Sequence, residues 1–342
     1  MRIAVVASPV TPLRPAQLGG AQAFICDLSV GLARLGHDVV LHCAEGSQVA
    51  GVRLAMVPVP RDAVDALVMP GGAEPAQSAG VEAALAAMFE SIAATGFDVI
   101  SQHAFDAPAF QLARDLPVLH TLHLPPIVTA VVQSAAATPA SRLATVSNSC
   151  QAAWRSAGVE VGHVLPNGVA PDPAPPAEVD RVALVAGRIS PEKGIEHAIG
   201  AARQVGLPVR MAGAHYDPAY EVDLRDVQVL GSLPRDELRR LMARSAVTIC
   251  AVRWDEPFGM VAAEAQMAGC PVAAYRRGAM PEVVEDGVSG CLAEPDDVTS
   301  MAHAISDCLE LDRSAVRASA LRRLGLDAAL DHYEVALERA AR

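Results

Sequence analysis

RIAVVASPVTPLRPAQLGGAQAFICDLSVGLARLGHDVVL, residues 2–41, is the stretch that decides the fold. Residues 3–7 form a short apolar run, which predicts a buried strand. After a loop that contains three prolines, apolar side chains recur every three or four residues, the spacing of one face of a helix. They are Phe24, Leu28, Leu32 and Leu35. Gly36 suits the end of that helix, and residues 39–41 form the next apolar strand. Strand, helix and strand in this order indicate a parallel α/β unit.

The same alternation continues along the chain, with one interruption in the middle. Further strands are predicted over residues 97–100, 118–122, 145–147, 182–186, 209–212, 227–230 and 247–250. The interruption is a group of five prolines, Pro166, Pro171, Pro173, Pro175 and Pro176. Proline fixes φ and lacks an N–H, so this stretch predicts a stiff linker between two α/β halves. Open parallel sheets bind ligands at the carboxyl ends of their strands, so two facing halves predict a site in the cleft between them.

The composition narrows the kinds of partner. The chain has 342 residues, 51% of them hydrophobic, and a net charge of −12. Such an acidic surface repels phosphate backbones and anionic lipid, so we expect no nucleic-acid partner and no stable membrane association. The seven cysteines are scattered and never spaced C-x-x-C, which is typical of reduced thiols in a cytoplasmic protein. The first apolar run is too short for a signal peptide, and no run reaches the roughly 18–20 residues of a membrane span.

The segment WDEPFGMVAAEA, residues 254–265, holds two glutamates at a distinctive spacing. It follows a predicted strand and opens a helix, for which Pro257 suits the first position and Gly269 the end. If the stretch is helical throughout, Glu256 and Glu264 lie roughly 12 Å apart along the axis and on nearly one side. Glycosidase carboxyls lie about 5–5.5 Å or 6.5–9.5 Å apart, so this pair does not fit glycoside hydrolysis.

A nucleotide sugar fits this spacing better. The N–H groups of Gly259, Met260 and Val261 at the helix start favour an anion. Glu264 would then bind a ribose, the N–H groups a phosphate, and Glu256 a sugar. The alternative is an ordinary surface helix whose acidic side chains have no special role.

The segment GRISPEKG, residues 187–194, adds two positive charges at the end of another predicted strand. Arg188 and Lys193 at that position would neutralise a departing diphosphate. The alternative is a solvated basic turn.

Two features of the first half could also reach a ligand. Gly19 and Gly20 let the backbone approach a phosphate or sugar closely, but the sequence there is not G-x-G-x-x-G, which argues against a nicotinamide site. His103 and His123 each follow a predicted strand and could bind a sugar, although lone histidines are more often structural. His120 lies three residues before His123, so on a strand the two point to opposite faces and make a poor metal pair. We therefore predict no metal site.

These motifs, with others, resemble retaining glycosyltransferases of family 4. The residues that carry the likeness are PNGV at 166–169, GRISPEKG at 187–194, EPFGMVAAEA at 256–265, GCPV at 269–272 and EVVEDG at 282–287. The likeness covers nearly the whole chain and is densest over residues 166–295. It implies a GT-B fold, in which two Rossmann-like, doubly wound domains face each other across a deep cleft. An acceptor-side domain would span residues 1–165, a nucleotide-sugar domain 166–325, and a helix in 326–342 would cross back to the first domain.

The resemblance also implies roles for particular residues. The activity would be metal-independent, retaining transfer of a hexosyl or pentosyl group from a nucleoside-diphosphate sugar, with UDP favoured, and no other cofactor. The expected catalytic residues are His123, Arg188, Lys193 and Glu256. The expected donor-binding residues are Gly19, Gly20, His103, Arg188, Lys193, Leu233, Glu256, Phe258, Gly259, Met260, Val261 and Glu264. Within this set Leu233 would hold the base through its backbone, and His123 would lie near the transferred sugar.

Two departures from the family pattern lie at the sugar end. The family often has Pro-Ser where this chain has AVRW, residues 251–254, and Gly-Gly where it has Gly278-Ala279. The donor sugar therefore stays open. Residues 7–24 and 249–260 resemble the family-4 glycosyltransferases of avilamycin-type orthosomycin antibiotic pathways, which implies a saccharide or natural-product acceptor such as an oligosaccharide antibiotic.

Alternatives of other classes share parts of this pattern. A GT-B epimerase or phosphorylase would have the same two domains, and a non-catalytic subunit could bind a sugar nucleotide without turning it over. A nicotinamide oxidoreductase is a more distant alternative. No side chain is an obvious nucleophile, so the sequence favours attack on the front face, helped by the departing phosphate oxygen.

Overall fold

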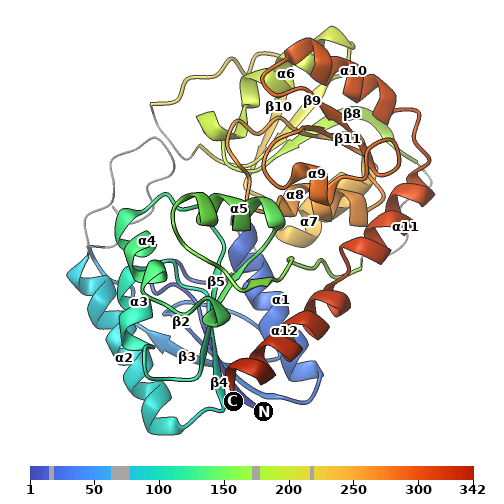
Figure 1. Ribbon diagram of the computed structural model, residues 1–342. Coiled ribbons are helices and arrows are strands. Elements are labelled where there is room, and N and C mark those ends of the chain that lie inside the picture. Colours follow the sequence, from blue (N-terminus) through green and yellow to red (C-terminus); the bar gives the residue numbers. More distant parts are fainter. Residues whose placement is uncertain (15–18, 63–77, 172–177, 216–218) are drawn as a thin grey trace. The chain divides into compact units, whose positions relative to one another are not determined.

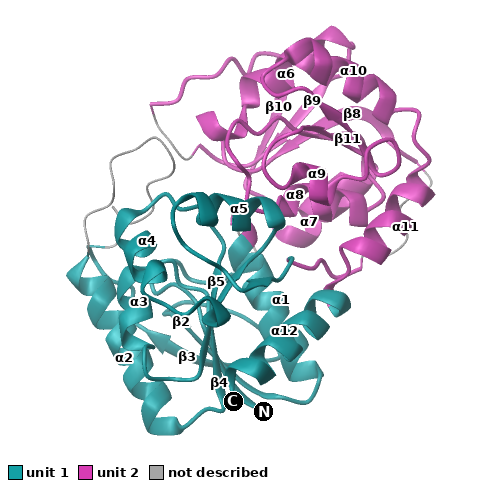
Figure 2. Ribbon diagram, viewed as in Figure 1, with its two compact units in different colours: residues 1–15, 21–166, 327–342 teal, residues 16–20, 167–326 magenta. Residues whose placement is uncertain are grey.

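The computed structural model describes residues 1–14, 19–62, 78–171, 178–215 and 219–342. Contacts divide the chain into two compact units (Figure 2). Unit 1 consists of residues 1–15, 21–166 and 327–342, and unit 2 of residues 16–20 and 167–326. Each unit is described below by itself.

Unit 1 is built on a seven-stranded sheet in which every pairing is parallel, in the order β3-β2-β1-β4-β5-β6-β7 (Figure 1). Its strands are β1 Arg2–Val6, β2 Asp38–Ala44, β3 Arg53–Val57, β4 Val99–Gln102, β5 Val118–Leu122, β6 Leu143–Thr145 and β7 His163–Val164. Its helices are α1 Gly20–Arg34, α2 Ala79–Thr95, α3 Ala107–Leu112, α4 Thr129–Ala136, α5 Asn148–Ser156 and α12 Leu326–Ala340. The strand order reverses beside β1, which pairs with both β2 and β4. In open α/β sheets such a reversal is where ligands bind.

Unit 2 repeats this plan with six parallel strands in the order β10-β9-β8-β11-β12-β13. Its strands are β8 Asp180–Ala186, β9 Val209–Ala212, β10 Val227–Gly231, β11 Ser245–Cys250, β12 Val272–Tyr275 and β13 Gly290–Ala293. Its helices are α6 Ile195–Gln204, α7 Arg235–Arg244, α8 Met260–Met267, α9 Met280–Val283, α10 Val298–Cys308 and α11 Arg313–Arg323. Here the order reverses between β8 and β11, which pair directly. The fold class predicted from the sequence, two Rossmann-like doubly wound α/β domains, is therefore confirmed.

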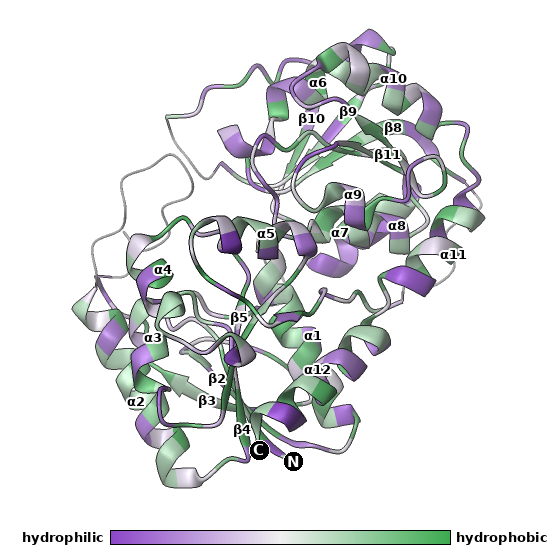
Figure 3. Cartoon of the chain, in the orientation of Figure 1, coloured by the Kyte–Doolittle hydropathy of each residue, from purple (hydrophilic) through white to green (hydrophobic). Residues whose placement is uncertain are grey.

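The central strands of both units are apolar because helices cover both faces of each sheet (Figure 3). In β1 all four residues from Ile3 to Val6 are fully buried. Among the described residues, no helix is both long and apolar enough to cross a membrane.

Two sequence predictions in unit 1 were wrong in detail. Leu35 was expected on the buried face of α1, but the helix ends at Arg34 and Leu35 is 44% exposed. The helix ends there because the Gly36 N–H donates to Ala33 O and Gly36 takes φ 92°, which terminates the helix. A strand was also expected over residues 145–147, but β6 ends at Thr145 because the Ser147 side chain caps α5 by accepting from the Cys150 N–H.

The linker prediction concerns residues that are described only in part. Pro173, Pro175 and Pro176 lie outside the described residues. Before them, Val169 is tied into unit 2, since its N–H donates to Leu324 O at 2.8 Å and its carbonyl accepts from Leu326 N–H at 3.0 Å. Residue 169 is thus part of a short parallel bridge with Gly325 rather than of a free spacer.

The C-terminal helix α12 packs against α1 within unit 1. A Cβ atom on Gly31 would come within 2.6 Å of the Leu330 side chain, so the absence of a side chain at Gly31 lets the two helices pack closely. Tyr333 is fully buried, with its ring 5.5 Å from the Phe24 ring. These contacts fix one wall of unit 1 near the carboxyl ends of β4 and β5.

Candidate active site

Two neighbouring loops of unit 2 carry most of the predicted site. The loop after β8 contains Arg188 and Lys193, and Lys193 ends a short 3-10 helix, Pro191–Lys193. The loop after β11 contains Trp254 and Glu256. Because β8 and β11 are adjacent parallel strands, both loops leave the same edge of the sheet.

Lys193, Trp254 and Glu256 form one cluster. The Glu256 Oε2 atom accepts a hydrogen bond from Lys193 Nζ at 2.7 Å and another from Trp254 Nε1 at 2.8 Å. The Lys193 ammonium also lies 5.4 Å from the centre of the Trp254 ring, a cation–π distance. The side chains of Lys193 and Glu256 are only 19% and 14% exposed. Lys193, which was predicted to bind phosphate, and Glu256, which was predicted to bind sugar, are therefore bound to each other in this structure.

Arg188 also has a carboxylate partner. Its Nη2 atom lies 3.4 Å from Glu192 Oε1, which accepts a second hydrogen bond from Ser190 Oγ at 2.7 Å. The Glu192 carbonyl accepts from the Arg253 N–H at 2.8 Å, which joins the two loops through the backbone. Glu192 was not singled out from the sequence, although it lies within the same motif.

Glu264 is paired with an arginine that the sequence analysis missed. Glu264 lies on α8, is buried, and its Oε1 atom accepts from Arg235 Nε at 2.7 Å. Arg235 is the first residue of α7 and follows Leu233 by two positions, so the structure brings the loop of Leu233 close to Glu264. The sequence could have indicated this partner of Glu264, because an arginine follows the predicted base-binding loop directly.

The start of α8 differs from the prediction. A helix from Pro257 was expected, but α8 begins at Met260 and Gly259 precedes it with φ 97°. That positive φ favours glycine, and a Cβ on Gly259 would lie 2.0 Å from Cε at the flexible end of the Met280 side chain. Glu256 lies in the loop, and its carbonyl accepts from the Ala279 N–H at 2.9 Å. The spacing of roughly 12 Å along one helix therefore does not apply.

The same loop explains one departure from the family pattern. Gly278 has φ 56°, and a Cβ there would lie 2.4 Å from the Glu256 nitrogen. Ala279 has ordinary right-handed φ and ψ and is fully buried. Glycine is therefore needed at the first position of the pair but not at the second.

In unit 1, His103 and His123 come together at the carboxyl ends of β4 and β5. The His103 Nδ1 atom lies 2.9 Å from His123 Nε2, and His103 Nε2 lies 2.8 Å from Ser101 Oγ. Both ring nitrogens of His103 are thus engaged within the protein, although His103 was expected to contact the donor. Ser101 and His103 are two apart and so point to the same face of the strand, a signal that the sequence contained.

Burial keeps this group of histidines neutral. Desolvation holds the pKa of His103 well below its ordinary value, and His123 and His120 lower it further. Desolvation also lowers the pKa of His123 to about 4 and that of His120 to about 3. His120 stacks on Phe110 at 4.4 Å and bonds to Gln102 Oε1 at 3.1 Å, so its role is structural.

The remaining predicted residues lie at the starts of the helices α1 and α8. Gly20 is the first residue of α1, directly after Gly19, in the connection that leaves the carboxyl end of β1. Phe258 is buried before α8, and Met260 and Val261 form its first turn. Within the described parts of the chain, no group of three or more His, Cys, Asp or Glu side chains is arranged to hold a metal ion.

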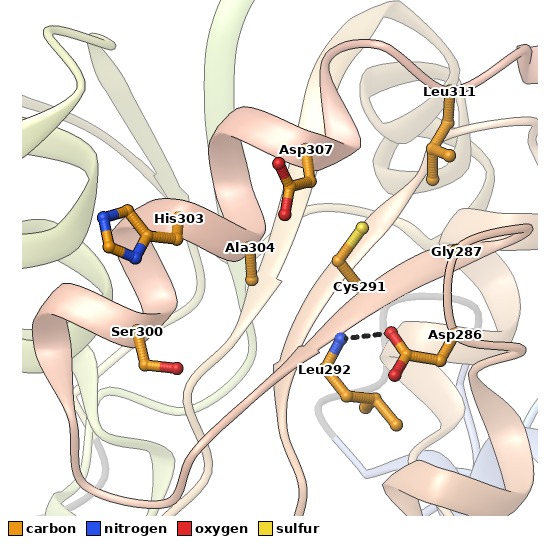
Figure 4. Close-up of a pocket in the computed structure, with 9 residues that line it drawn as sticks. All are labelled: Asp286, Gly287, Cys291, Leu292, Ser300, His303, Ala304, Asp307 and Leu311. Carbon is orange, nitrogen blue, oxygen red and sulfur yellow. Dashed lines mark hydrogen bonds between the residues drawn. The ribbon is translucent and has the colours of Figure 1, made fainter.

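A separate cavity of about 530 Å³ lies between β13 and α10 (Figure 4). Cys291 lines it, and a hydrogen bond from the Cys308 thiol lowers the Cys291 pKa. The Asp286 carboxylate at its edge accepts from the Leu292 N–H at 2.9 Å and from Arg276 Nη2 at 2.8 Å. None of the predicted site residues lines this cavity.

The two doubly wound units define the GT-B class of fold, and comparison with solved structures agrees. The complex of Anabaena Alr3699/HepE with UDP-glucose matches with a TM-score of 0.76 and 20% identity, over 99% of this chain and all of that one. AviGT4, a glycosyltransferase involved in avilamycin A biosynthesis, matches with a TM-score of 0.74 and 21% identity, over 99% and 98% of the two chains. At this identity the likeness establishes the fold.

Sequence comparisons point to one group of enzymes. Residues 18–173 match the model of Glycosyltransferase Family 4, and residues 171–322 match that of Glycosyl transferases group 1. The chain thus has the GT-B fold, and each of the two family models matches a little less than half of it. Glycogen synthase of Mycobacterium tuberculosis is 31% identical over 47% of this chain and 41% of that enzyme. D-Inositol 3-phosphate glycosyltransferase of Xylanimonas cellulosilytica is 28% identical over 98% and 96%. The matched part therefore spans about two fifths of the glycogen synthase.

Proposed function

We propose that this protein is a retaining, metal-independent glycosyltransferase that uses a nucleoside-diphosphate sugar, with UDP favoured, as its donor. The observation that supports this most is the cluster of Lys193, Trp254 and Glu256 beside Arg188. It lies at the carboxyl ends of two adjacent strands where the order of the sheet reverses, the usual place for a ligand in such sheets.

A diphosphate would compete with the carboxylates for the two cations. Lys193 and Arg188 are paired with Glu256 and Glu192, so the charge of the cluster is balanced without a ligand. A diphosphate that binds these cations would release Glu256 to bind sugar hydroxyls. The first N–H groups of α8, which have no acceptor within the helix, would add to phosphate binding.

The transfer step needs no protein nucleophile. The bond from the sugar C1 to the diphosphate breaks, and the acceptor oxygen bonds to C1 on the same face, which retains the configuration. The proton of the acceptor hydroxyl passes to the departing phosphate oxygen. Arg188 and Lys193 stabilise the charge that develops on the leaving group, and the remaining rate enhancement comes from positioning.

The nucleoside would lie beside Glu264. Arg235 Nε binds Glu264 Oε1, and the Oε2 atom of the same carboxylate would accept hydrogen bonds from the ribose hydroxyls. The backbone of Leu233 would hold the base. The preference for UDP is supported by the solved GT-B neighbours, of which one contains UDP-glucose and another UDP.

The N-terminal domain would supply the acceptor side, and Gly19, Gly20 and His123 would contact the donor. We propose a hydroxyl of a saccharide or natural product as the acceptor. The names of the relatives, glycogen synthase and D-inositol 3-phosphate glycosyltransferase, support a polyhydroxylated acceptor, and AviGT4 supports an antibiotic oligosaccharide. The seven free cysteines support a cytoplasmic location.

A thermal-shift panel of UDP, GDP, ADP and dTDP tests the nucleotide, because a ligand at 100 times its Kd stabilises the fold by about 2.7 kcal/mol. We expect UDP to raise the Tm most, and Glu264→Gln to reduce that shift while leaving the shift caused by pyrophosphate unchanged. No shift with any of the four nucleotides would contradict the proposal.

Turnover of UDP-glucose separates the enzyme from its alternatives. A glycosyltransferase releases UDP faster when a saccharide acceptor is added. A GT-B epimerase would convert the donor sugar without an acceptor, and a non-catalytic subunit would bind UDP without releasing any from UDP-glucose.

A further inference from the structure

Two side chains of unit 2 donate to the same oxygen atom of Glu256 from different parts of the chain. Lys193 Nζ lies 2.7 Å from Oε2 and belongs to the loop after β8, 63 residues away. Trp254 Nε1 lies 2.8 Å from the same atom and is only two residues away, in the loop after β11. The direction of both bonds is fixed, because an ammonium and an indole N–H can only donate. Neither of the two bonds uses Oε1.

The two links differ in how easily each can be exchanged for another partner. Lysine carries a compact charge on a flexible four-carbon stem, so Lys193 can turn toward any anion that enters the site. The indole of Trp254 is rigid and has two rotatable side-chain bonds, so its N–H stays at one place. The link from Trp254 also closes within a short turn, since the Glu256 N–H donates to the Trp254 carbonyl at 2.9 Å.

The backbone on both sides of Trp254 is held by hydrogen bonds. The Arg253 N–H donates to the Glu192 carbonyl at 2.8 Å, and the Glu256 carbonyl accepts from the Ala279 N–H at 2.9 Å. These bonds join backbone atoms, so they do not depend on the side chain of Lys193. The loop can therefore keep its shape when Lys193 binds something else.

Glu256 needs a donor when Lys193 leaves it. The Glu256 side chain is only 14% exposed, so water replaces a lost partner poorly. A carboxylate without hydrogen bonds in such surroundings is costly, whereas a hydrogen bond to a charged acceptor is among the stronger kinds. Of the two donors to Oε2, Trp254 is the one that remains.

We propose that Trp254 is a positioning residue, whose indole N–H holds Oε2 of Glu256 in place while Lys193 exchanges that oxygen for a phosphate. Oε1 is then the atom that binds a sugar hydroxyl. This inference rests on the proposed function for the identity of the phosphate and the sugar. The Trp254 ring makes a separate contact with the Lys193 ammonium, 5.4 Å from the ring centre, so its test has to separate the ring from the N–H.

The link between Trp254 and Glu256 can be observed without any ligand. The chain has two tryptophans, so a ¹H–¹⁵N correlation spectrum shows two indole signals, and Trp254→Phe identifies that of Trp254. An indole proton bonded to a carboxylate resonates downfield, so Glu256→Gln should shift the Trp254 signal upfield. The Trp154 signal is the internal control, because Trp154 Nε1 donates to the Leu124 carbonyl in unit 1. An unmoved Trp254 signal in Glu256→Gln would overturn the proposal.

Lys193→Met imitates the exchange, because it removes the cation from Glu256 as a phosphate would. We expect the Trp254 signal to stay downfield in Lys193→Met, and also in the wild-type protein saturated with UDP. If the signal moves in either sample to its position in Glu256→Gln, Glu256 leaves Trp254 when it loses Lys193, and the proposal is wrong.

Two substitutions of Trp254 separate its N–H from its ring. Trp254→Phe keeps an aromatic face for Lys193 and removes the N–H, whereas Trp254→Leu removes both. With UDP-glucose as the donor, both variants should lower kcat by roughly 10–100-fold with a smaller change in KM, since a displacement of about 1 Å can cost about 100-fold. A wild-type kcat in Trp254→Phe beside a low kcat in Trp254→Leu would assign the effect to the ring and overturn the proposal.

A double substitution tests whether Trp254 acts through Glu256. In a Glu256→Ala background, Trp254→Phe should lower kcat by less than about twofold, because effects within one hydrogen-bonded group are not additive. Losses that multiply would give Trp254 an independent role and contradict the proposal. If the wild-type protein releases no UDP from UDP-glucose, the proposed function fails, while the spectra of Glu256→Gln and Lys193→Met still decide whether Trp254 holds the carboxylate.

Discussion

The carboxyl edges of the two parallel sheets use opposite chemistry. In unit 1 the residues that follow β4 and β5 are neutral histidines, almost completely buried and joined by hydrogen bonds to a serine. In unit 2 the loops after β8 and β11 carry two ion pairs that remain partly exposed. In unit 2 both strands lie at the reversal of strand order, and in unit 1 β4 lies beside the reversal and β5 next to β4. The topology thus determines where these residues lie, and the sequence determines whether they are neutral or charged.

The difference shows what each kind of group can do. A buried neutral imidazole can present a donor of fixed direction, because low dielectric surroundings make its hydrogen bonds strong and keep it uncharged. A partly hydrated ion pair can exchange one partner for another, because breaking it does not leave a charge buried without compensation. Unit 1 is thus suited to orienting a substrate, and unit 2 to taking up and releasing a charged group.

The largest expected effect is the loss of a cation from unit 2. Arg188→Ala should lower kcat by about 10²–10³-fold, the usual result of removing one group that stabilises developing charge. The KM for the acceptor should change far less, because the charge appears on the leaving group in the transition state. Steady-state kinetics with UDP-glucose measure both values.

Arg240→Ala is the matched control for Arg188→Ala. Arg240 also pairs with a carboxylate four residues away, Asp236, but on the exposed surface of α7. Its loss should leave kcat unchanged. An Arg188→Ala variant that raised the acceptor KM at constant kcat would contradict a role at the leaving group.

A second expected effect concerns the stability of unit 1 in acid. Burial lowers the pKa of His42 and His123 to about 4 and that of His120 to about 3, below the value of about 6.5 in an unfolded chain. The unfolded state therefore binds more protons below pH 6.5, and the stability present above that pH is lost as the pH falls toward the folded values. Each ring can cost up to about 1.4 kcal/mol per pH unit in this window, so three rings together can cost a few kcal/mol.

Each unit contains one tryptophan, so the unfolding of each unit can be followed by fluorescence. Trp154 is fully buried in unit 1, and Trp254 lies in the charged cluster of unit 2. Urea unfolding of Trp254→Phe, followed by Trp154 fluorescence, should show a midpoint that falls between pH 7 and pH 4.5. A urea midpoint for unit 1 that stays constant over this pH range would show that the buried histidines do not make the stability of unit 1 depend on pH.

The sequence predicted the fold well because the fold depends on local patterns. β5 and β9 begin and end at the predicted residues, and the buried positions of α1 repeat with helical spacing. The strands β3, β7, β12 and β13 were not predicted. β3 is an edge strand whose Met56 is half exposed, yet residues 54–57 form a continuous apolar run that the sequence analysis did not use.

The site was less predictable because its geometry depends on partners far apart in the sequence. The link between Lys193 and Glu256 spans 63 residues, and that between Arg235 and Glu264 spans 29. The straight helix expected from Glu256 is absent because the Glu256 carbonyl accepts from the Ala279 N–H and Gly259 takes a positive φ. Motif spacing identified these residues as candidates, but only tertiary contacts determine which side chains form ion pairs with one another. The roles of the individual residues stay predictions.

The smallest expected effect separates binding from turnover within unit 2. Glu256→Gln keeps the shape of the side chain and removes the charge that occupies Lys193. UDP then no longer competes with a carboxylate, so we expect its affinity to rise several-fold, which corresponds to about 1 kcal/mol. Isothermal titration calorimetry at low and high salt measures this affinity, and the gain should shrink with salt because part of it is Coulombic.

Turnover of UDP-glucose should fall in the same variant, since the neutral amide binds sugar hydroxyls less strongly than a carboxylate. If the variant binds UDP more weakly than the wild type, Glu256 supports the phosphate site rather than competing for it. Lys193 would then not exchange Glu256 for a phosphate, and the contrast drawn between the unit 2 ion pairs and the unit 1 histidines would be wrong.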